Sequence, residues 1–124
     1  MRIPIIGVGT REAYLALRSD DQLENRFEPI VLPLWAVGAD TLSLLASFAA
    51  ALPLHRPSGI ATADTAQYLL AQSAGTIGQL TRLLTAAAIA AVESGEESIN
   101  HRTLVMADYV GPTERRRLFE RELL

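Results

Sequence analysis

The chain has 124 residues, a net charge of −3 and no cysteine, so it is one domain or a piece of one, long enough for a hydrophobic core. Without cysteine it has no disulfide, no thiolate nucleophile and no cysteine metal site, and we expect a cytoplasmic protein. The acidic pI, near 5.3, excludes binding of nucleic acid by the charge of the whole surface, but a local basic patch could still bind it.

All eleven cationic side chains of the chain are arginines. A phosphate loop needs a lysine to reach the β- and γ-phosphates of a nucleotide, so this chain contains no such loop. Its apolar runs are interrupted before the roughly 18 residues needed to cross a bilayer, so we expect no membrane contact. His55 and His101 lie far apart and have no carboxylate or thiol at ligand spacing, so we expect no metal site.

The first predicted element is a strand over residues 3–9, an isoleucine-rich run bounded by glycines. Such a run is typical of a strand buried on both faces of a parallel sheet. Because it begins almost at the first residue, we expect the chain to start inside a larger gene product. Thr10 can cap a helix over residues 11–17, and residues 19–21 provide the cap for a second, short helix that ends near Arg26.

A second strand is predicted over residues 29–35, and Pro33 places it at a sheet edge or strand end because proline cannot donate to the ladder. The remaining sequence predicts helices, with Asp40 and Asp64 as caps and Gly75 as the residue that ends one of them. The expected ranges of these helices are 40–52, 64–74, 76–94, 102–109 and 113–124. We therefore predict a mostly α chain in which two strands of an α/β layer precede a helical bundle.

Four short motifs occur in these segments. In chain order they are Gly9-Thr10, Asp20-x-x-Leu23-x-x-Arg26-Phe27, Leu32-Pro33-Leu34 and Gly75-Thr76-Ile77-Gly78. This succession resembles the C-terminal half of the AAA+ ATPases that regulate DNA transposition, the TniB type and its TnsC relatives. The resemblance extends from Ile3 to about Leu104 and covers no phosphate loop.

The resemblance implies that residues 1–37 are the C-terminal part of the AAA+ nucleotide-binding α/β core. Residues 38–124 would then be the helical lid domain with a charged C-terminal helix. In the intact parent, the family implies ATP and Mg²⁺ as cofactors, and transposase and DNA as partners in target selection. The chain alone is expected to be inactive as an ATPase, because the phosphate loop and the strand with the Mg²⁺-binding acid are both missing.

The same resemblance implies roles for individual residues. Thr10 would be the sensor-one residue facing the γ-phosphate and the attacking water, or alternatively a plain helix cap. Arg26 would act in trans as an arginine finger on the γ-phosphate of a neighbouring subunit, or alternatively be a surface residue beside carboxylates. Gly75 and Arg82 are the candidate cofactor-binding residues. Arg82 is the candidate sensor two because Gly78 stands where the family carries an arginine, and its alternative is a solvated helix residue.

Four further interpretations follow from the sequence. The Gly7-x-Gly9 pair is no dinucleotide fingerprint, because Glu12 stands where the third glycine belongs. The four arginines between residues 113 and 124 suggest contact with DNA or transposase, but the interspersed glutamates favour a solvated helix laced with ion pairs. The alternative function is a small helical interaction or dimerisation module. We also expect self-association, because the two strands would have unpaired edges.

Overall fold

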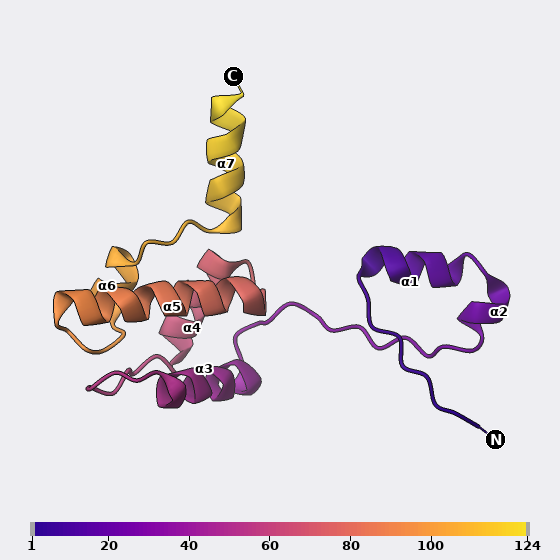
Figure 1. Cartoon of the computed structure of the whole chain (residues 1–124), viewed down its shortest axis with the longest axis horizontal. Coiled ribbons are helices and arrows are strands. Elements are labelled where there is room, and N and C mark those ends of the chain that lie inside the picture. The colour runs from indigo at the N-terminus through magenta and orange to yellow at the C-terminus, as the bar shows by residue number, and fades with distance from the viewer. Residues whose placement is uncertain (1, 124) are drawn as a thin grey trace. The chain divides into compact units, whose positions relative to one another are not determined.

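The computed structural model describes residues 2–123, and within this range the ordered elements are helices (Figure 1). They are α1 (Arg11–Arg18), α2 (Asp21–Glu24), α3 (Ala39–Ala51), α4 (Ala63–Ser73), α5 (Ile77–Ser94), α6 (His101–Met106) and α7 (Pro112–Glu122). The chain divides into two compact units, Met1–Pro33 and Leu34–Leu124. Each unit is described by itself.

The N-terminal unit contains the two helices that the sequence predicts there. Asp20 caps α2, because its carboxylate accepts hydrogen bonds from the backbone N–H of Gln22 at 2.9 Å and of Leu23 at 3.4 Å. This confirms the predicted cap. An exposed ion pair of 3.5 Å joins Arg18, the last residue of α1, to Glu24 at the end of α2.

The two predicted strands are wrong. Residues 3–9 and 29–35 form no strand, and apart from the half-buried Trp35 their apolar side chains lie in solvent, with Val8 94% and Leu32 88% exposed. An isoleucine-rich run predicts burial, but a strand forms only where another strand pairs with its backbone N–H and C=O groups. Within the described part of this unit no other segment supplies that pairing.

The helical unit is built around α5. Helix α4 packs against α3 and α5, and α6 packs against α5. Leucines and alanines recur along one stripe of α5 at helical spacing and face the interior. The hydrophobic core consists of Leu45, Ile60, Ala66, Leu69, Leu80, Leu83, Leu84, Ala87, Ile99 and Leu104. Burial of each of the larger side chains contributes about 1.5–3 kcal/mol to stability.

Two of the predicted caps lie elsewhere. The N-cap of α3 is Gly38 and that of α4 is Thr62, whose hydroxyl accepts from the backbone N–H of Thr65 at 3.3 Å. Asp40 and Asp64 instead lie in the first turns of these helices. Carboxylates there still favour the helix by interacting with the unpaired N–H groups at its N-terminus.

The corner between α4 and α5 turns the chain by 111°. Ala74 and Gly75 both adopt left-handed backbone conformations, with φ of 54° and 71°, so Gly75 ends α4 as predicted. A Cβ at Gly75 would lie 3.0 Å from the carbonyl oxygen of Trp35, whose N–H donates to the Gly75 carbonyl at 2.8 Å. Gly75 is therefore required by both its conformation and this close backbone approach.

Two loops at the other end of α5 are joined by hydrogen bonds. The backbone N–H of Arg56 donates to the Glu97 carbonyl at 2.9 Å, and the Ser98 hydroxyl donates to the Pro57 carbonyl at 2.8 Å. Asn100 then begins α6 through a capping box with Thr103. Helix α6 ends at Met106, three residues before the predicted end, and this leaves residues 107–111 as an extended link to α7.

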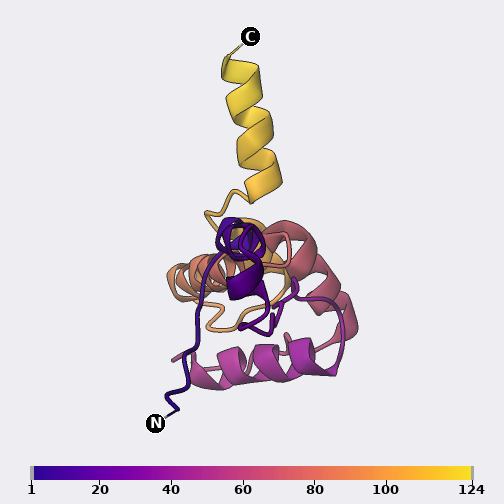
Figure 2. The same ribbon diagram turned by 90° about the vertical axis from the view of Figure 1, so that its right-hand side faces the viewer.

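Helix α7 leads away from the bundle (Figures 1 and 2). It is anchored at its start, where Gly111 is buried against the carbonyl oxygen of Gln72. Its side chains are otherwise largely exposed, and Arg117 pairs with Glu114 at 3.5 Å, as expected for a solvated charged helix. The predicted end of this helix at Leu124 lies outside the described residues.

Among residues 2–123, no single helix is long and apolar enough to cross a membrane. The bent pair α4 and α5 reaches that length and composition only when both helices are taken together. Both helices supply side chains to the core of the helical unit.

Candidate functional site

Thr10 stands at the N-cap position of α1, but its side chain makes no capping hydrogen bond to the helix backbone. Its hydroxyl instead interacts with the carboxylate of Glu12 in the first turn. Hydrogen bonds from the backbone N–H of Glu12 and from the Thr10 hydroxyl hold the pKa of Glu12 below its usual value. The hydroxyl that the resemblance assigns to nucleotide sensing therefore lies beside the Glu12 carboxylate.

We expect Thr10→Val to move the pKa of Glu12 upward, because the mutation removes one of the two hydrogen bonds that favour the carboxylate. With the pKa lowered in the folded state, this interaction stabilises α1 above the ordinary pKa of glutamate and is lost as pH falls through the lowered value. NMR titration of the Glu12 carboxyl carbon measures the shift. Thr10→Ser keeps the hydroxyl and is the matched control, so equal shifts in both variants would contradict this role.

Arg26 lies in the turn that follows α2, where its backbone N–H donates to the Leu23 carbonyl at 3.1 Å. Its side chain is exposed, and no ion pair within the described residues involves it. Of the neighbouring carboxylates, Glu24 is paired with Arg18. The guanidinium of Arg26 is thus presented to solvent, as a residue acting on another molecule must be.

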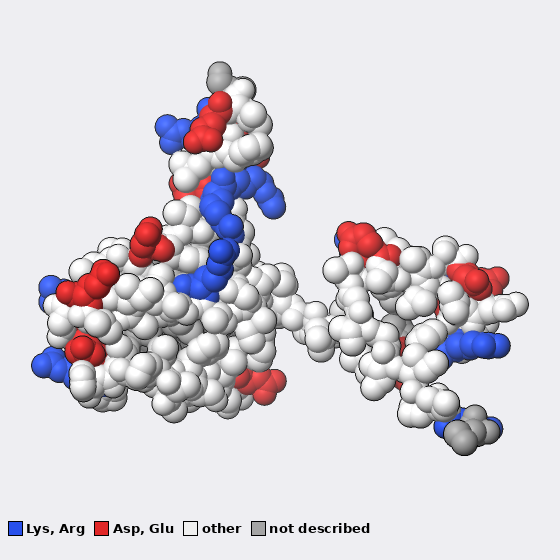
Figure 3. All heavy atoms as spheres, viewed as in Figure 1, with Lys and Arg blue, Asp and Glu red and all other residues white. Residues whose placement is uncertain are grey.

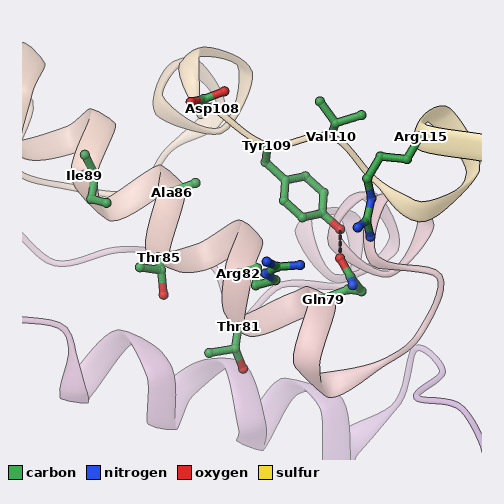
Figure 4. Close-up of a pocket in the computed structure, with 10 residues that line it drawn as sticks. All are labelled: Gln79, Thr81, Arg82, Thr85, Ala86, Ile89, Asp108, Tyr109, Val110 and Arg115. Atoms are coloured by element: carbon green, nitrogen blue, oxygen red, sulfur yellow. Dashed lines mark hydrogen bonds between the residues drawn. The ribbon is translucent and has the colours of Figure 1, made fainter. Parts of the chain in front are cut away.

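A groove of about 550 Å³ lies beside α5 in the helical unit (Figure 4). One wall is the outward face of α5, and the other is the 107–111 link with the first turn of α7. The lining residues are Gln79, Thr81, Arg82, Thr85, Ala86, Ile89, Asp108, Tyr109, Val110 and Arg115. The predicted residue Arg82 belongs to this groove, whereas Gly75 does not line it.

Tyr109 is the polar centre of this groove. Its hydroxyl lies 3.2 Å from Oε1 of Gln79 and 3.3 Å from the carbonyl oxygen of Gln72, so its proton is shared between two acceptors. Partial burial raises the pKa of Tyr109, and the positive charges of Arg115 and Arg82 oppose that rise. Both arginines are therefore close enough to act on the phenol electrostatically.

The two guanidinium groups converge from different helices. Figure 4 shows Arg82 on α5 and Arg115 on α7 extending toward the Tyr109 hydroxyl and Gln79. Asp108, the acidic residue of the groove, lies toward the Ile89 end, away from both guanidinium groups (Figure 4). Neither arginine is part of an ion pair among the described residues. Such an arrangement can bind an anion.

Only some of the residues that line this groove could be predicted from the sequence. Arg82 and the arginines of the last helix were noted separately, but nothing in their spacing indicated that they meet. Tyr109 and Gln79 were not noted, because a tyrosine at the end of a predicted helix and a glutamine on a solvated face carry no signal of function. Their hydrogen bond depends on two chain segments that lie 30 residues apart.

His55 lies in the loop between α3 and α4, and His101 is the first residue of α6. No group of three or more metal-ligating side chains occurs in the part of the chain that the structure describes. His101 packs edge-on against Tyr68, with ring centroids 6.4 Å apart, and lines a second, smaller groove of about 420 Å³.

Comparison with known proteins gives one match. Residues 1–37 are similar to the family described as Bacterial TniB protein. No curated protein and no solved structure matches the chain. The match contains Thr10 and Arg26 and ends before α3, so it supports a TniB-like relationship over the N-terminal unit and the following few residues. The predicted resemblance of residues 38–104 lies outside it.

Proposed function

We propose that this protein takes part in DNA transposition as a component of a TniB-type AAA+ ATPase. The observation that carries the proposal is the match of residues 1–37 to the TniB family, in the segment where Arg26 stands. In this proposal the chain works with a part that supplies the phosphate loop, because it has no lysine of its own. ATP and Mg²⁺ would bind to the complete ATPase, and transposase and DNA would be its partners in the cytoplasm.

Arg26 and Thr10 would be the catalytic residues of this ATPase. The guanidinium of Arg26, exposed in the turn after α2, would contact the γ-phosphate of a neighbouring subunit, and its exposure supports this role. Thr10 would exchange its interaction with Glu12 for one with the nucleotide or the attacking water. The exposed apolar segments around residues 3–9 and 30–34 also support the proposal, because partner strands of a complete nucleotide-binding core would cover them.

The helical unit would be the lid, with Arg82 as its nucleotide-facing residue. Arg82 is exposed on α5 and is accessible from the groove. Gly75 shapes the corner that orients α5, and this structural role accounts for its presence without a nucleotide contact.

A second candidate function is a helical interaction module. It is favoured by the fact that the family match ends at residue 37, whereas residues 34–124 form a unit with its own hydrophobic core. In that case the helical unit would bind a protein partner and Arg82 would have no nucleotide to contact.

We expect the chain alone to show no ATP turnover and no affinity for Mg·ATP tighter than about 1 mM, because the main phosphate contacts come from a phosphate loop. Isothermal titration calorimetry measures the affinity, and a coupled assay measures turnover. A binding isotherm in the micromolar range would contradict the proposal. Addition of the part that contains the phosphate loop is the positive control, since it should restore both activities.

A further inference from the structure

The groove between α5 and α7 contains more hydrogen-bond donors than the protein itself uses. The Tyr109 hydroxyl donates toward Oε1 of Gln79, which orients this amide and leaves its Nε2 without a hydrogen bond in the described structure. Arg82 and Arg115 add two guanidinium groups at the same end of the groove, one from each wall (Figure 4). The amide and both guanidinium groups are donors only at these positions, so their common ligand must be an acceptor.

The charge around these donors is positive. The basic side chains gather where α7 leaves the bundle, as the space-filling view shows (Figure 3). Arg115 is followed directly by Arg116 and Arg117, and the carboxylate of Glu114 is taken up by Arg117. Two unpaired arginines that face one another across a groove repel each other, and an anion between them removes this repulsion.

We propose that this groove binds a phosphoryl group through Arg82, Arg115 and the amide of Gln79. The planar guanidinium groups match phosphate oxygens, and the Tyr109 ring offers a flat apolar surface to the base of the nucleotide that carries this phosphate. The site goes beyond the proposed ATPase function, because Arg115 comes from α7 and the site requires neither a phosphate loop nor Arg26.

The phosphoryl group can come from a mononucleotide or from a nucleic acid strand. Arg116, which directly follows Arg115 and has no ion pair among the described residues, favours a strand, because a second phosphate would then have a cation to contact. A mononucleotide would meet only the groove. The two sources therefore differ in which arginines contribute to affinity.

The test uses the full chain and three probes at constant ionic strength: inorganic phosphate, ATP without Mg²⁺, and a fluorescent single-stranded oligothymidylate of twelve nucleotides. Fluorescence anisotropy measures oligonucleotide binding, and calorimetry measures the other two. We expect Arg82→Ala and Arg115→Ala each to weaken oligonucleotide binding about five- to tenfold and to lower the salt slope of log K by about 0.7, the value for one phosphate contact on a single strand.

Gln79→Glu is the variant with the largest expected loss of phosphate affinity. It keeps an oxygen to accept the Tyr109 hydrogen bond, but its carboxylate pairs with the arginines and excludes phosphate, so we expect at least a tenfold loss of affinity. Arg102→Ala is the matched control, because it removes the same charge from α6, outside the groove, where Arg102 pairs with Glu96 at 3.0 Å. Circular dichroism melting confirms that all variants are folded.

Binding of the oligonucleotide that weakens in the groove variants, but changes less than twofold in Arg102→Ala, supports the site with nucleic acid as the source. Groove-dependent binding of phosphate or ATP alone supports it with a mononucleotide as the source. Equal effects of Arg82→Ala and Arg102→Ala, or no binding of any probe, would overturn the proposal. The ATPase function has its own tests, which use Arg26 and the phosphate loop, and Arg82 is the residue that the two proposed sites share.

Discussion

In the ATPase proposed above, Arg26→Ala is expected to lower the rate of ATP turnover about a hundredfold or more while nucleotide affinity stays nearly unchanged. An arginine finger contacts the charge that develops on the γ-phosphoryl group, so its loss raises the barrier and leaves ground-state binding intact. The exposed position of Arg26 after α2 makes a large effect on folding unexpected, since no ion pair within the described residues depends on its side chain.

Arg26 is expected to act on the nucleotide of a neighbouring subunit, so the prediction can also be tested by mixing two variants. In the proposed ATPase, a subunit with Arg26→Ala keeps the phosphate loop that the other part supplies, and a subunit whose phosphate loop is inactivated keeps Arg26. Mixing the two should partly restore turnover, because some interfaces then combine an intact loop with an intact arginine. Two inactive proteins that stay inactive when mixed would contradict action across a subunit interface.

Arg18→Ala is the matched control for Arg26. Arg18 belongs to the same unit and is also exposed, but it pairs with Glu24 at 3.5 Å and lies 5.8 Å from the centre of the Tyr14 ring. An exposed pair of this kind contributes under about 1 kcal/mol, so turnover should change little. Turnover equal to that of the parent in both variants would leave Arg26 as a surface residue.

The helices could be predicted from the sequence because their signals are local. Asp20 caps α2 through its own carboxylate, and Gly75 adopts a backbone conformation that glycine tolerates best. The helix that begins after Thr76 was predicted almost to the residue, because its leucine and alanine stripe continues without a break to Gly95. Such features are complete within a few residues of sequence.

The strands could not be predicted in the same way. An isoleucine-rich run such as residues 3–9 fits a buried strand, but the run does not say which segment pairs with it. The groove could not be predicted from the sequence for a related reason. Tyr109 meets Gln79 only because the corner at Gly75 directs α5 and the 107–111 link returns to it. The roles of Thr10, Arg26 and Arg82 came from the family resemblance and stay predictions.

The isolated chain is expected to associate with itself through the apolar segments of its N-terminal unit. Ile6 is 87% and Leu32 88% exposed, and the backbone beside them has no strand partner among the described residues. Burial of each such side chain is worth about 1.5–3 kcal/mol. Pairing of these segments between two copies would satisfy backbone donors and acceptors at the same time. Sedimentation velocity over a hundredfold range of concentration should therefore show a dimer or larger species.

The double variant Ile6→Asp with Leu32→Asp should shift this equilibrium to monomer, because a carboxylate on each segment opposes burial of both. Val105→Asp is the control, since Val105 is 63% exposed on α6 in the other unit and is not part of the apolar segments. If the unmodified chain stays monomeric at every concentration, the prediction of self-association is wrong, and the segments do not need a second copy. The partner strands of the complete nucleotide-binding core would then be the occupants to examine, because they can supply both the apolar surface and the backbone pairing that residues 3–9 and 30–34 lack.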